Sequence, residues 1–286
     1  MNKIKVGESM YRIGFYIGCK EQINQGKALV ESIKNNLKIE IYIVIPKTLE
    51  KSISIEGVNI IKVEIPFNLR TIPFIDKIFA ASKFEEICKE RYIWVDVDTY
   101  IFKSFKLPNK YGVYINPVDK KNIGDLYGEK RSQIWRITYN YLKIYKNEMF
   151  VNTTISNEKI FPYYNVGMVL VNNKKGLFKN TKISIKKLLS DSLMKELLEK
   201  SFANKVFFHQ VVFTCCVIKL YRNDTGKLPE GLNYPLHLHN ENLNSVNLKD
   251  IKSIRYDNFF DNNSPPEEWK GIFNPIKNDL KSTWYY

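Results

Sequence analysis

The pattern of apolar and polar positions near the start of the chain predicts a β-α-β unit. Apolar residues dominate Tyr11–Ile17 and Ile39–Ile45, as expected for strands. Between these two runs, Glu21–Asn36 has its apolar residues at helical spacing, which predicts an amphipathic helix. Two strands joined by a helix are typical of a parallel pair.

The same alternation continues to the middle of the chain. A third apolar run covers Val58–Ile65, a second helix is predicted over Pro73–Glu90, and another strand ends at Asp96. Repeated alternation of strands and helices implies a mainly parallel sheet with helices on both faces. We therefore expect an α/β fold for the first half of the chain.

The second half continues this pattern less regularly. The sequence predicts strands over Gly112–Asn116 and Tyr164–Asn172, and helices over Ile123–Lys146, Ile183–Lys200 and Val206–Leu220. The helix over 183–200 is basic and amphipathic, and the helix over 206–220 is apolar enough to be buried.

After about Tyr221 the periodicity fades, and Asn, Asp, Pro and Gly become frequent. We expect loops and short strands here, wrapped on the main unit. The predicted organisation is a catalytic domain over residues 1–220 and a C-terminal extension over residues 221–286 that packs on the same domain.

Charge and cysteine content narrow the possible partners and compartment. The formal charge of +14 calls for acidic partners, such as nucleotide phosphates, nucleic acid or an anionic membrane. Most of the excess is scattered lysine, which favours a solvated surface. The four cysteines form no disulfide-like pattern, so a reducing cytoplasm is expected. The apolar segment Val206–Ile218 is too short to span a bilayer.

Two aspartates at the end of an apolar run are the main candidate for chemistry. Asp96 and Asp98 follow the strand ending at Val95, and residues two apart on a strand point to one side. Ligands bind at the carboxyl ends of strands in open α/β sheets. Because Mg²⁺ and Mn²⁺ prefer oxygen ligands, often one or two carboxylates plus substrate phosphates, the pair predicts a site for a nucleotide diphosphate.

With these segments placed, the chain resembles the nucleotide-diphospho-sugar transferases of the GT-A fold, especially bacterial and archaeal relatives of glycosyltransferase family 8. The resemblance runs in order from the first strand to about His239. It is carried by residues 28–33, 73–77, 94–99 and 164–170, by His209-Gln210, and by Leu228-Pro229 with Asn233-Tyr234-Pro235. It implies a Rossmann-like sheet and a hexosyltransferase that uses a nucleotide-diphosphate sugar, UDP-sugar favoured.

The resemblance assigns metal and phosphate binding. It implies that Asp96 and Asp98 bind Mn²⁺ or Mg²⁺ between the two phosphates of the donor. Such an ion stabilises the departing diphosphate as a Lewis acid. Lys77 is expected to neutralise a phosphate oxygen, although an exposed helix lysine is an equal alternative.

The resemblance also assigns contacts to the donor sugar. Asn165 and Gly167 correspond to a step that borders the sugar, where glycine allows a close approach of the backbone. Gln210 lies in an apolar segment, and relatives place Gln or Asp beside the anomeric carbon. The alternatives are a β-bulge at Gly167 and a core glutamine at position 210.

Relatives commonly add a late histidine as a third metal ligand. His237 and His239 lie two apart, so on a strand they would face the same way, and either could complete the site. Many relatives have a histidine near the place where this chain has Ile254-Arg255-Tyr256-Asp257, and here none is present. Asp257 is a weaker candidate.

The remaining contacts are expected at the first strand and in the tail. Tyr16, Ile17 and Gly18 at the end of the first strand should approach the base and ribose. The acceptor, whether a saccharide, a lipid-linked sugar or a protein, is expected over the aromatic tail, where Trp269, Phe273 and Trp284 could stack on sugar faces. The kinship implies retention of configuration, with Gln210 supporting the reacting centre.

Two other function classes share features with this chain. A haloacid-dehalogenase-like phosphatase also starts from Asp-x-Asp after a strand, but Tyr100 occupies the position where Thr or Val is usual. A basic, non-catalytic protein that binds nucleic acid or membranes would explain the charge. However, aspartates at a strand end are unfavourable beside a phosphate backbone. We expect no nucleic-acid partner and a cytoplasmic protein, with peripheral contact to the inner membrane face as an option.

Overall fold

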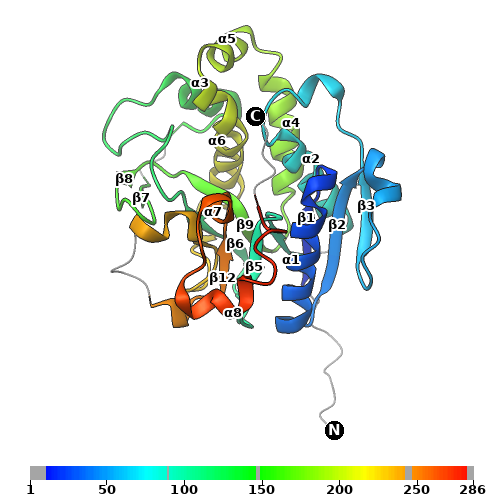
Figure 1. Cartoon of the computed structure of the whole chain (residues 1–286). Coiled ribbons are helices and arrows are strands. Elements are labelled where there is room, and N and C mark those ends of the chain that lie inside the picture. The colour runs from blue at the N-terminus through cyan, green and yellow to red at the C-terminus, as the bar shows by residue number, and fades with distance from the viewer. Residues whose placement is uncertain (1–10, 89, 146–148, 242–246, 282–286) are drawn as a thin grey trace.

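A seven-stranded sheet forms the centre of the molecule (Figure 1). The computed structural model describes residues 11–88, 90–145, 149–241 and 247–281. The strand order is β10-β6-β9-β4-β1-β2-β3. The strands are β1 (Arg12–Tyr16), β2 (Glu40–Pro46), β3 (Asn59–Val63), β4 (Arg91–Val95), β6 (Gly112–Pro117), β9 (Tyr164–Asn172) and β10 (Thr225–Gly226). Every neighbouring pair is parallel except those with β9, which runs antiparallel to β4 and β6. This confirms the expected mainly parallel α/β sheet.

The antiparallel direction of β9 determines which residues meet at one sheet edge. Val95, the last residue of β4, pairs with Met168, and Pro117, the last residue of β6, pairs with Tyr164. The beginning of β9 therefore lies beside the carboxyl ends of β4 and β6. Residues just outside these three strand ends form one rim.

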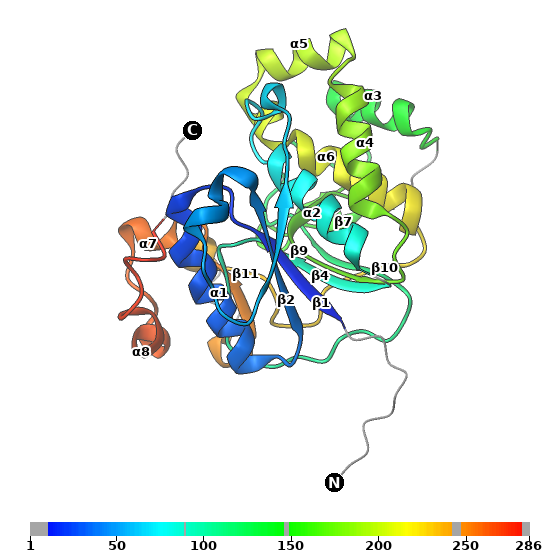
Figure 2. The same ribbon diagram turned by 90° about the vertical axis from the view of Figure 1, so that its right-hand side faces the viewer.

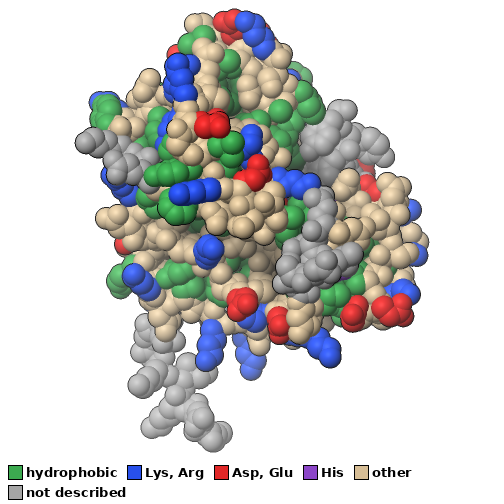
Figure 3. Space-filling view, turned by 90° about the vertical axis from the view of Figure 1, so that its left-hand side faces the viewer, with side chains coloured by type: hydrophobic (Ala, Val, Ile, Leu, Met, Phe, Trp, Pro, Cys, Tyr) green, Lys and Arg blue, Asp and Glu red, His purple; other side chains and the backbone are tan. Residues whose placement is uncertain are grey.

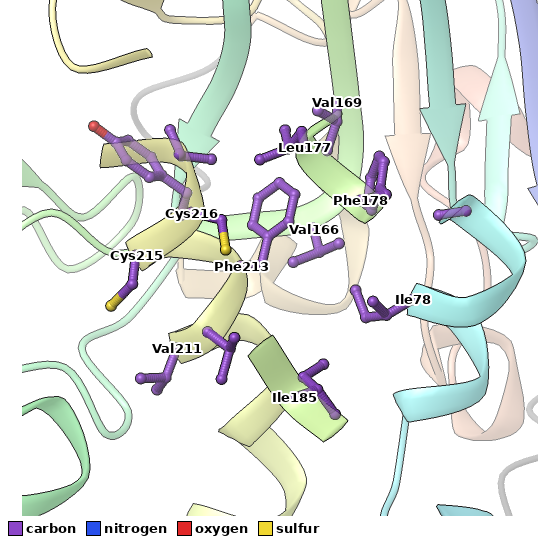
Figure 4. Packing of buried hydrophobic residues seen from close by; sticks show 14 of the residues in the cluster. Ile78, Val166, Val169, Leu177, Phe178, Ile185, Val211, Phe213, Cys215 and Cys216 are labelled. Carbon is purple, nitrogen blue, oxygen red and sulfur yellow. The ribbon is translucent and has the colours of Figure 1, made fainter. Parts of the chain in front are cut away.

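Helices cover both faces of the sheet because the strands alternate their buried side chains. Tyr92 and Trp94 of β4 belong to the core under α2, α4 and α6, whereas Ile93 and Val95 belong to the core under α1. Figure 4 shows the first core, where α2, α4, α6 and β9 interdigitate. The helices are α1 (Ile23–Asn36), α2 (Ile75–Ile87), α3 (Gln133–Leu142), α4 (Leu177–Leu188), α5 (Ser192–Lys200) and α6 (Phe202–Tyr221).

Two predicted helices are wrong in their extent. The helix expected over Ile123–Lys146 begins only at Gln133, and the residues before it make turns and an isolated bridge from Leu126 to Ile160. Lys146 lies outside the described residues. The helix expected over Ile183–Lys200 is two helices, because the Asp191 side chain accepts a hydrogen bond from Met194 N and caps a new helix.

The apolar helix α6 is longer than predicted. It begins after Ser201, whose side chain accepts a hydrogen bond from Asn204 N. By length and composition it could cross a bilayer, and it is the one helix of the described residues that passes this test. Most of it is buried inside the protein against α3, α4 and β9, as is usual for a core helix.

The C-terminal segment has the expected loops and short elements and lies against α1 (Figure 2). A small sheet joins β11 (Tyr234–Pro235) and β12 (Ser253–Arg255) to β5 (Thr99–Ile101), the strand that follows Asp98. The other short elements are β7 (Val151–Asn152), β8 (Lys159–Ile160), α7 (Phe259–Asn262) and α8 (Lys270–Phe273). Since β12 pairs antiparallel with β5, the tail lies next to the Asp96–Asp98 segment.

Candidate active site

Asp96 and Asp98 lie at the rim where β4, β6 and β9 meet. The backbone N of Asp96 donates to Gly167 O at 2.8 Å, which ties the motif to β9. The Lys77 ammonium on α2 donates to Asp96 Oδ2 at 2.9 Å. Asp98 is almost fully buried, with 3% of its surface exposed. The motif is therefore part of the folded rim and is not a solvated turn.

A cavity of about 380 Å³ opens beside this rim. Segments far apart in the sequence line it: α2, the motif, the residues after β6, the start of β9, α6 and the tail. The lining residues are Phe74, Lys77, Asp96, Val118, Asp119, Lys120, Asn122, Asn165, Gly167, Val206, Phe207, His209, Gln210, His237, Leu238, Arg255 and Asp257. Its size suits a ligand of moderate size, such as part of a nucleotide sugar.

Arg255 holds two carboxylates beside the motif. Its Nη2 lies 2.6 Å from Asp119 Oδ2, and its Nε donates to Asp257 Oδ2 at 2.8 Å. His237 Nδ1 lies 2.7 Å from the same Asp257 oxygen. Burial alone would raise the pKa of Asp257, but Arg255 and His237 together hold that pKa below its usual range.

Asp98 has the opposite electrostatic environment. Burial raises its pKa well above the usual range, and the neighbouring Asp257 and Asp96 raise it further. Oδ1 of Asp98 and Oδ1 of Asp96 are both buried with no hydrogen-bond partner among the described residues. Buried polar atoms ordinarily have partners, so these two carboxylate oxygens are placed to accept a cation, with Asp96 lining the cavity and Asp98 buried behind it.

A family model for the Rhodobacterales glycosyltransferase domain matches residues 32–220, which include α2, the Asp96 motif and all but the last residue of α6. The chain belongs to this glycosyltransferase family. No curated protein matches the sequence.

Solved structures agree on the fold of this glycosyltransferase domain. Two structures of the glycosyltransferase GlyE from Streptococcus pneumoniae are similar, with TM-scores of 0.51 and 0.52 and identities of 12% and 14%. They match 96% and 95% of this chain, which spans 62% of the length of each GlyE chain. A mutant of LgtC is 13% identical over 91% of this chain and 99% of its own, with a TM-score of 0.48. The likeness to the two GlyE structures confirms the expected GT-A fold.

The donor-sugar candidates all reach the cavity of this glycosyltransferase domain. Asn165 Oδ1 accepts a hydrogen bond from Gly167 N at 2.6 Å. A side chain at position 167 would crowd Asn165 and Arg255, because a Cβ there would lie 2.8 Å from Asn165 Oδ1. Gln210 lies on buried α6 and lines the cavity. The structure thus brings Lys77, Asn165, Gly167 and Gln210 together with Asp96.

The two histidines proposed as metal ligands lie in different surroundings. They lie in a 3₁₀ segment over Leu236–Glu241, so the expectation that they share one side of a strand is wrong. His237 lines the cavity and contacts Asp257. His239 does not line it, and its Nδ1 is 2.9 Å from the Tyr234 hydroxyl. Burial lowers the pKa of His239.

A second cavity of about 460 Å³ shares Phe74 with the first. Seven of its lining residues are apolar or aromatic, two are basic and one is acidic. The lining residues are Tyr16, Gly18, Pro46, Thr48, Ile65, Arg70, Thr71, Ile72, Pro73, Phe74, Asp76, Phe202 and Lys205. The Ile17 side chain is fully buried in the core and does not reach it. Of the three residues predicted at the end of β1, Tyr16 and Gly18 line this cavity.

The shared residue Phe74 has an unusual backbone. Its φ of 62° is left-handed, which is costly for a bulky residue and is often found at ligand sites. The ring centroid lies 5.4 Å from Lys77 Nζ and 5.2 Å from that of the His209 ring. Phe74 therefore forms the boundary between the two cavities.

Several site residues were missed or underrated at the level of sequence. Asp119 follows β6, so the strand-end rule that identified Asp96 could have found it. Arg255 and Asp257 lie on and just after a short strand without periodicity, and only the tertiary pairing of β12 with β5 reveals their role. The tail rings Trp269 and Phe273 are buried against Phe102, which contradicts the expected acceptor platform there. Trp284 lies outside the described residues.

Proposed function

We propose that this domain transfers a sugar from a nucleotide-diphosphate donor, UDP-sugar favoured, to an acceptor hydroxyl in a reaction that needs Mn²⁺ or Mg²⁺. The observation that carries the proposal is the pair of buried, unsatisfied oxygens on Asp96, which lines the cavity beside Lys77, and on Asp98, which is buried behind it. A cavity with carboxylates and fixed cations side by side suits a phosphate ligand bound through a metal ion.

The charges beside the motif suit a divalent ion. Four carboxylates, those of Asp96, Asp98, Asp119 and Asp257, surround two fixed cations, Lys77 and Arg255. Lys120 also lines the cavity, so with all four ionised and His237 neutral one negative charge remains uncompensated. A bound divalent ion would favour the ionised form of Asp98. Among the described residues no three Asp, Glu, His or Cys side chains form a closed metal cage. An ion would thus be held by Asp96, Asp98 and the donor phosphates, which is the usual coordination for Mg²⁺.

Lys77 and the metal ion would both stabilise the negative charge of the departing diphosphate. When bound, the ion supplies Lewis-acid stabilisation of the departing diphosphate. The Lys77 side chain is only 14% exposed and already forms a charge-assisted hydrogen bond to Asp96. A phosphate oxygen entering the cavity would meet the same ammonium, whose other hydrogens are donors. Lys77 therefore orients and neutralises the diphosphate.

The second cavity is proposed to hold the nucleoside. Tyr16 presents a half-buried ring there, and Arg70 and Lys205 supply positive charge. A flat base gains from stacking on an aromatic ring, and Phe74 connects this cavity to the phosphate site. The donor would then extend from Tyr16, past Phe74, to Asp96.

Retention of configuration fits the groups around the reacting sugar. An inverting reaction needs a carboxylate that is available as a general base. In the cavity, Asp119 and Asp257 are engaged by Arg255, and Asp96 is engaged by Lys77. Gln210 instead offers a neutral amide oxygen that can support positive charge at the anomeric carbon. Glu267 and Glu268 do not line the cavity.

Activity with a panel of sugar nucleotides tests the proposal. The protein is incubated with each donor and Mn²⁺ or EDTA, and release of nucleoside diphosphate is measured. We expect release with at least one UDP-sugar and Mn²⁺, with loss of release in EDTA. NMR of the product anomeric proton then reports retention. Equal release with and without metal would contradict the metal dependence.

The cellular setting is part of the proposal. A cytoplasmic location and peripheral contact of the basic surface with an anionic membrane both follow from composition. Such contact would bring the enzyme close to lipid-linked acceptors.

A further inference from the structure

An exposed aromatic group lies on the segment between β6 and β9. The Tyr127 ring is 5.3 Å from the Phe150 ring and 5.2 Å from the Phe161 ring, so the three form one patch. Phe150 is 51% exposed, and Tyr127 and Phe161 are half-buried. The aromatic rings of the tail differ, because Trp269 and Phe273 are buried in a hydrophobic core. The patch therefore presents aromatic surface where the tail does not.

Two cationic side chains lie over these rings. Lys159 Nζ is 4.0 Å from the Phe150 centroid and 4.7 Å from the Tyr127 centroid, and the Arg131 guanidinium is 3.7 Å from the Phe161 centroid. At such distances a ring face attracts the cation. We call these five residues the aromatic–cationic surface. Figure 3 looks onto this side of the molecule and shows Lys and Arg side chains among exposed hydrophobic ones.

The aromatic–cationic surface is connected to the rim of the first cavity by hydrogen bonds. Asp119, which lines the cavity, accepts from Thr154 Oγ1 at 2.6 Å through Oδ1 and from Ile155 N at 3.1 Å through its backbone O. Tyr127 N donates to Lys159 O at 3.0 Å, within the surface itself. Residues 118–121 and the β7–β8 hairpin are thus one hydrogen-bonded unit. A ligand on the surface would lie on the same structural unit as the cavity rim.

We propose that the aromatic–cationic surface binds the acceptor, and that the acceptor is a saccharide bearing a carboxylate. The inference rests on the proposed sugar transfer. The Arg131 guanidinium stacks between the Phe161 ring and the buried Tyr139 ring, 3.7 Å and 4.1 Å from their centroids, so the exposed Lys159 ammonium is the group that meets a ligand carboxylate. Sugar rings present C–H faces that pack on aromatic rings, and a carboxylate forms charge-assisted hydrogen bonds with an ammonium group. The local charge agrees: residues 120–131 and 158–159 contain five basic side chains and three acidic ones. A neutral acceptor would gain nothing from this positive charge.

A glycan array tests the assignment with uronate- and sialate-containing oligosaccharides beside neutral ones of similar length. The test variant is Phe150→Ala with Lys159→Gln. The matched control is Tyr111→Ala with Lys110→Gln, since Tyr111 is 63% exposed and precedes β6 at the strand end opposite the cavity. We expect wild type and control to retain acidic oligosaccharides, and the test variant to retain them about tenfold less, as loss of charged hydrogen bonds implies.

Three results would overturn the acceptor assignment: retention of neutral glycans only, no retention of any glycan, or equal retention by the test variant and wild type. Thermal stabilisation by UDP with Mn²⁺, measured on the same samples, separates this assignment from the proposed function. If wild type shows no such stabilisation, the sugar-transfer proposal fails. If the stabilisation is present and glycan retention does not depend on the surface, only the acceptor assignment fails.

Discussion

The two cavities that meet at Phe74 differ in how they are built. The first is lined by Asp96, Lys77 and Arg255 beside the buried Asp98, and several of its charged groups are largely buried and form ion pairs. The second has fewer charged residues, Arg70, Asp76 and Lys205, and its walls include the rings of Tyr16, Phe74 and Phe202. Charged groups in a cavity of low polarity interact strongly and specifically, whereas aromatic walls accept any flat ligand of suitable size. The difference favours phosphate and metal in the first cavity and the base in the second.

Loss of the buried cation in the first cavity should have the largest effect. Arg255→Met leaves Asp119 and Asp257 without their shared partner, and removing one member of a buried ion pair costs about 3–5 kcal/mol. The free energy of unfolding, measured by urea titration, should fall by that amount. Arg12→Met is the control, because the Arg12 and Glu40 side chains are 25% and 42% exposed, against 7% for Arg255, and the loss should be closer to the roughly 1 kcal/mol of a surface pair. Similar losses in both variants would show that Arg255 is not a buried clamp.

Removal of the Lys77 ammonium should weaken binding of a phosphate-bearing ligand and leave binding of the nucleoside alone unchanged. Lys77→Met removes a charge-assisted donor worth about 1.5–3 kcal/mol, so UDP affinity should fall about 10- to 100-fold while uridine affinity stays unchanged. Calorimetric titration of both ligands checks this. Lys83→Met on the same helix is the control, because Lys83 is exposed and pairs with Glu86. A parallel loss of uridine binding would contradict the division.

Removal of an aromatic ring from the second cavity should weaken the binding of both uridine and UDP. Tyr16→Ala removes the proposed stacking ring, which is worth about 1–3 kcal/mol for a base. Uridine and UDP should both weaken by the same factor, about tenfold. Tyr42→Ala serves as the control, since Tyr42 lies on β2 and does not line either cavity. If UDP binding falls and uridine binding does not, the base lies elsewhere.

The smallest expected effect is a pH dependence that differs between the cavities. Burial raises the pKa of Asp76 in the second cavity above its usual value of about 3.8, with Lys77 opposing the shift. The folded state therefore binds this proton more tightly, so the Asp76 contribution to stability declines as pH rises from about 3.8 through the folded-state pKa. Asp257 in the first cavity contributes in the opposite sense, since its lowered pKa adds stability above about 3.8.

Urea titrations of wild type and Asp76→Asn check the sign, over a pH range that runs from about 3.5, just below the ordinary aspartate pKa, to about 7. Each unit of raised pKa corresponds to about 1.4 kcal/mol. The variant should lose less stability than wild type as pH rises. A wild type that gains more than the variant over this range would show that the carboxylate of Asp76 is favoured by the fold.

The sheet could be predicted from the sequence because its central strands, β4 and β9 among them, are buried on both faces and read as continuous apolar runs. Trp94 and Val171 are examples, and each lies in a predicted strand. The break between α4 and α5 was missed because apolar spacing continues through it, while the local cap at Asp191 decides the boundary.

The site was only partly predictable for a different reason. Asp96 and Asp98 follow a strand directly, so local pattern and strand-end geometry identify them. Arg255 and Asp257 reach the cavity only because β12 pairs with β5 across about 150 residues of sequence, which no periodicity encodes. The exposed Phe150 and the buried Phe273 cannot be distinguished by residue type. Their difference lies in tertiary packing.

Metal-dependent stabilisation by UDP tests the central claim most directly. At a hundredfold excess over its dissociation constant, a ligand raises the free energy of unfolding by about 2.7 kcal/mol. We predict a gain of this size for wild type with UDP and Mn²⁺, and its loss in Asp96→Asn and Asp98→Asn. Asn at position 98 should fold, since Asp98 has an unsatisfied oxygen and its pKa is raised by burial. An equal gain with and without Mn²⁺, or an undiminished gain in both variants, would contradict the account.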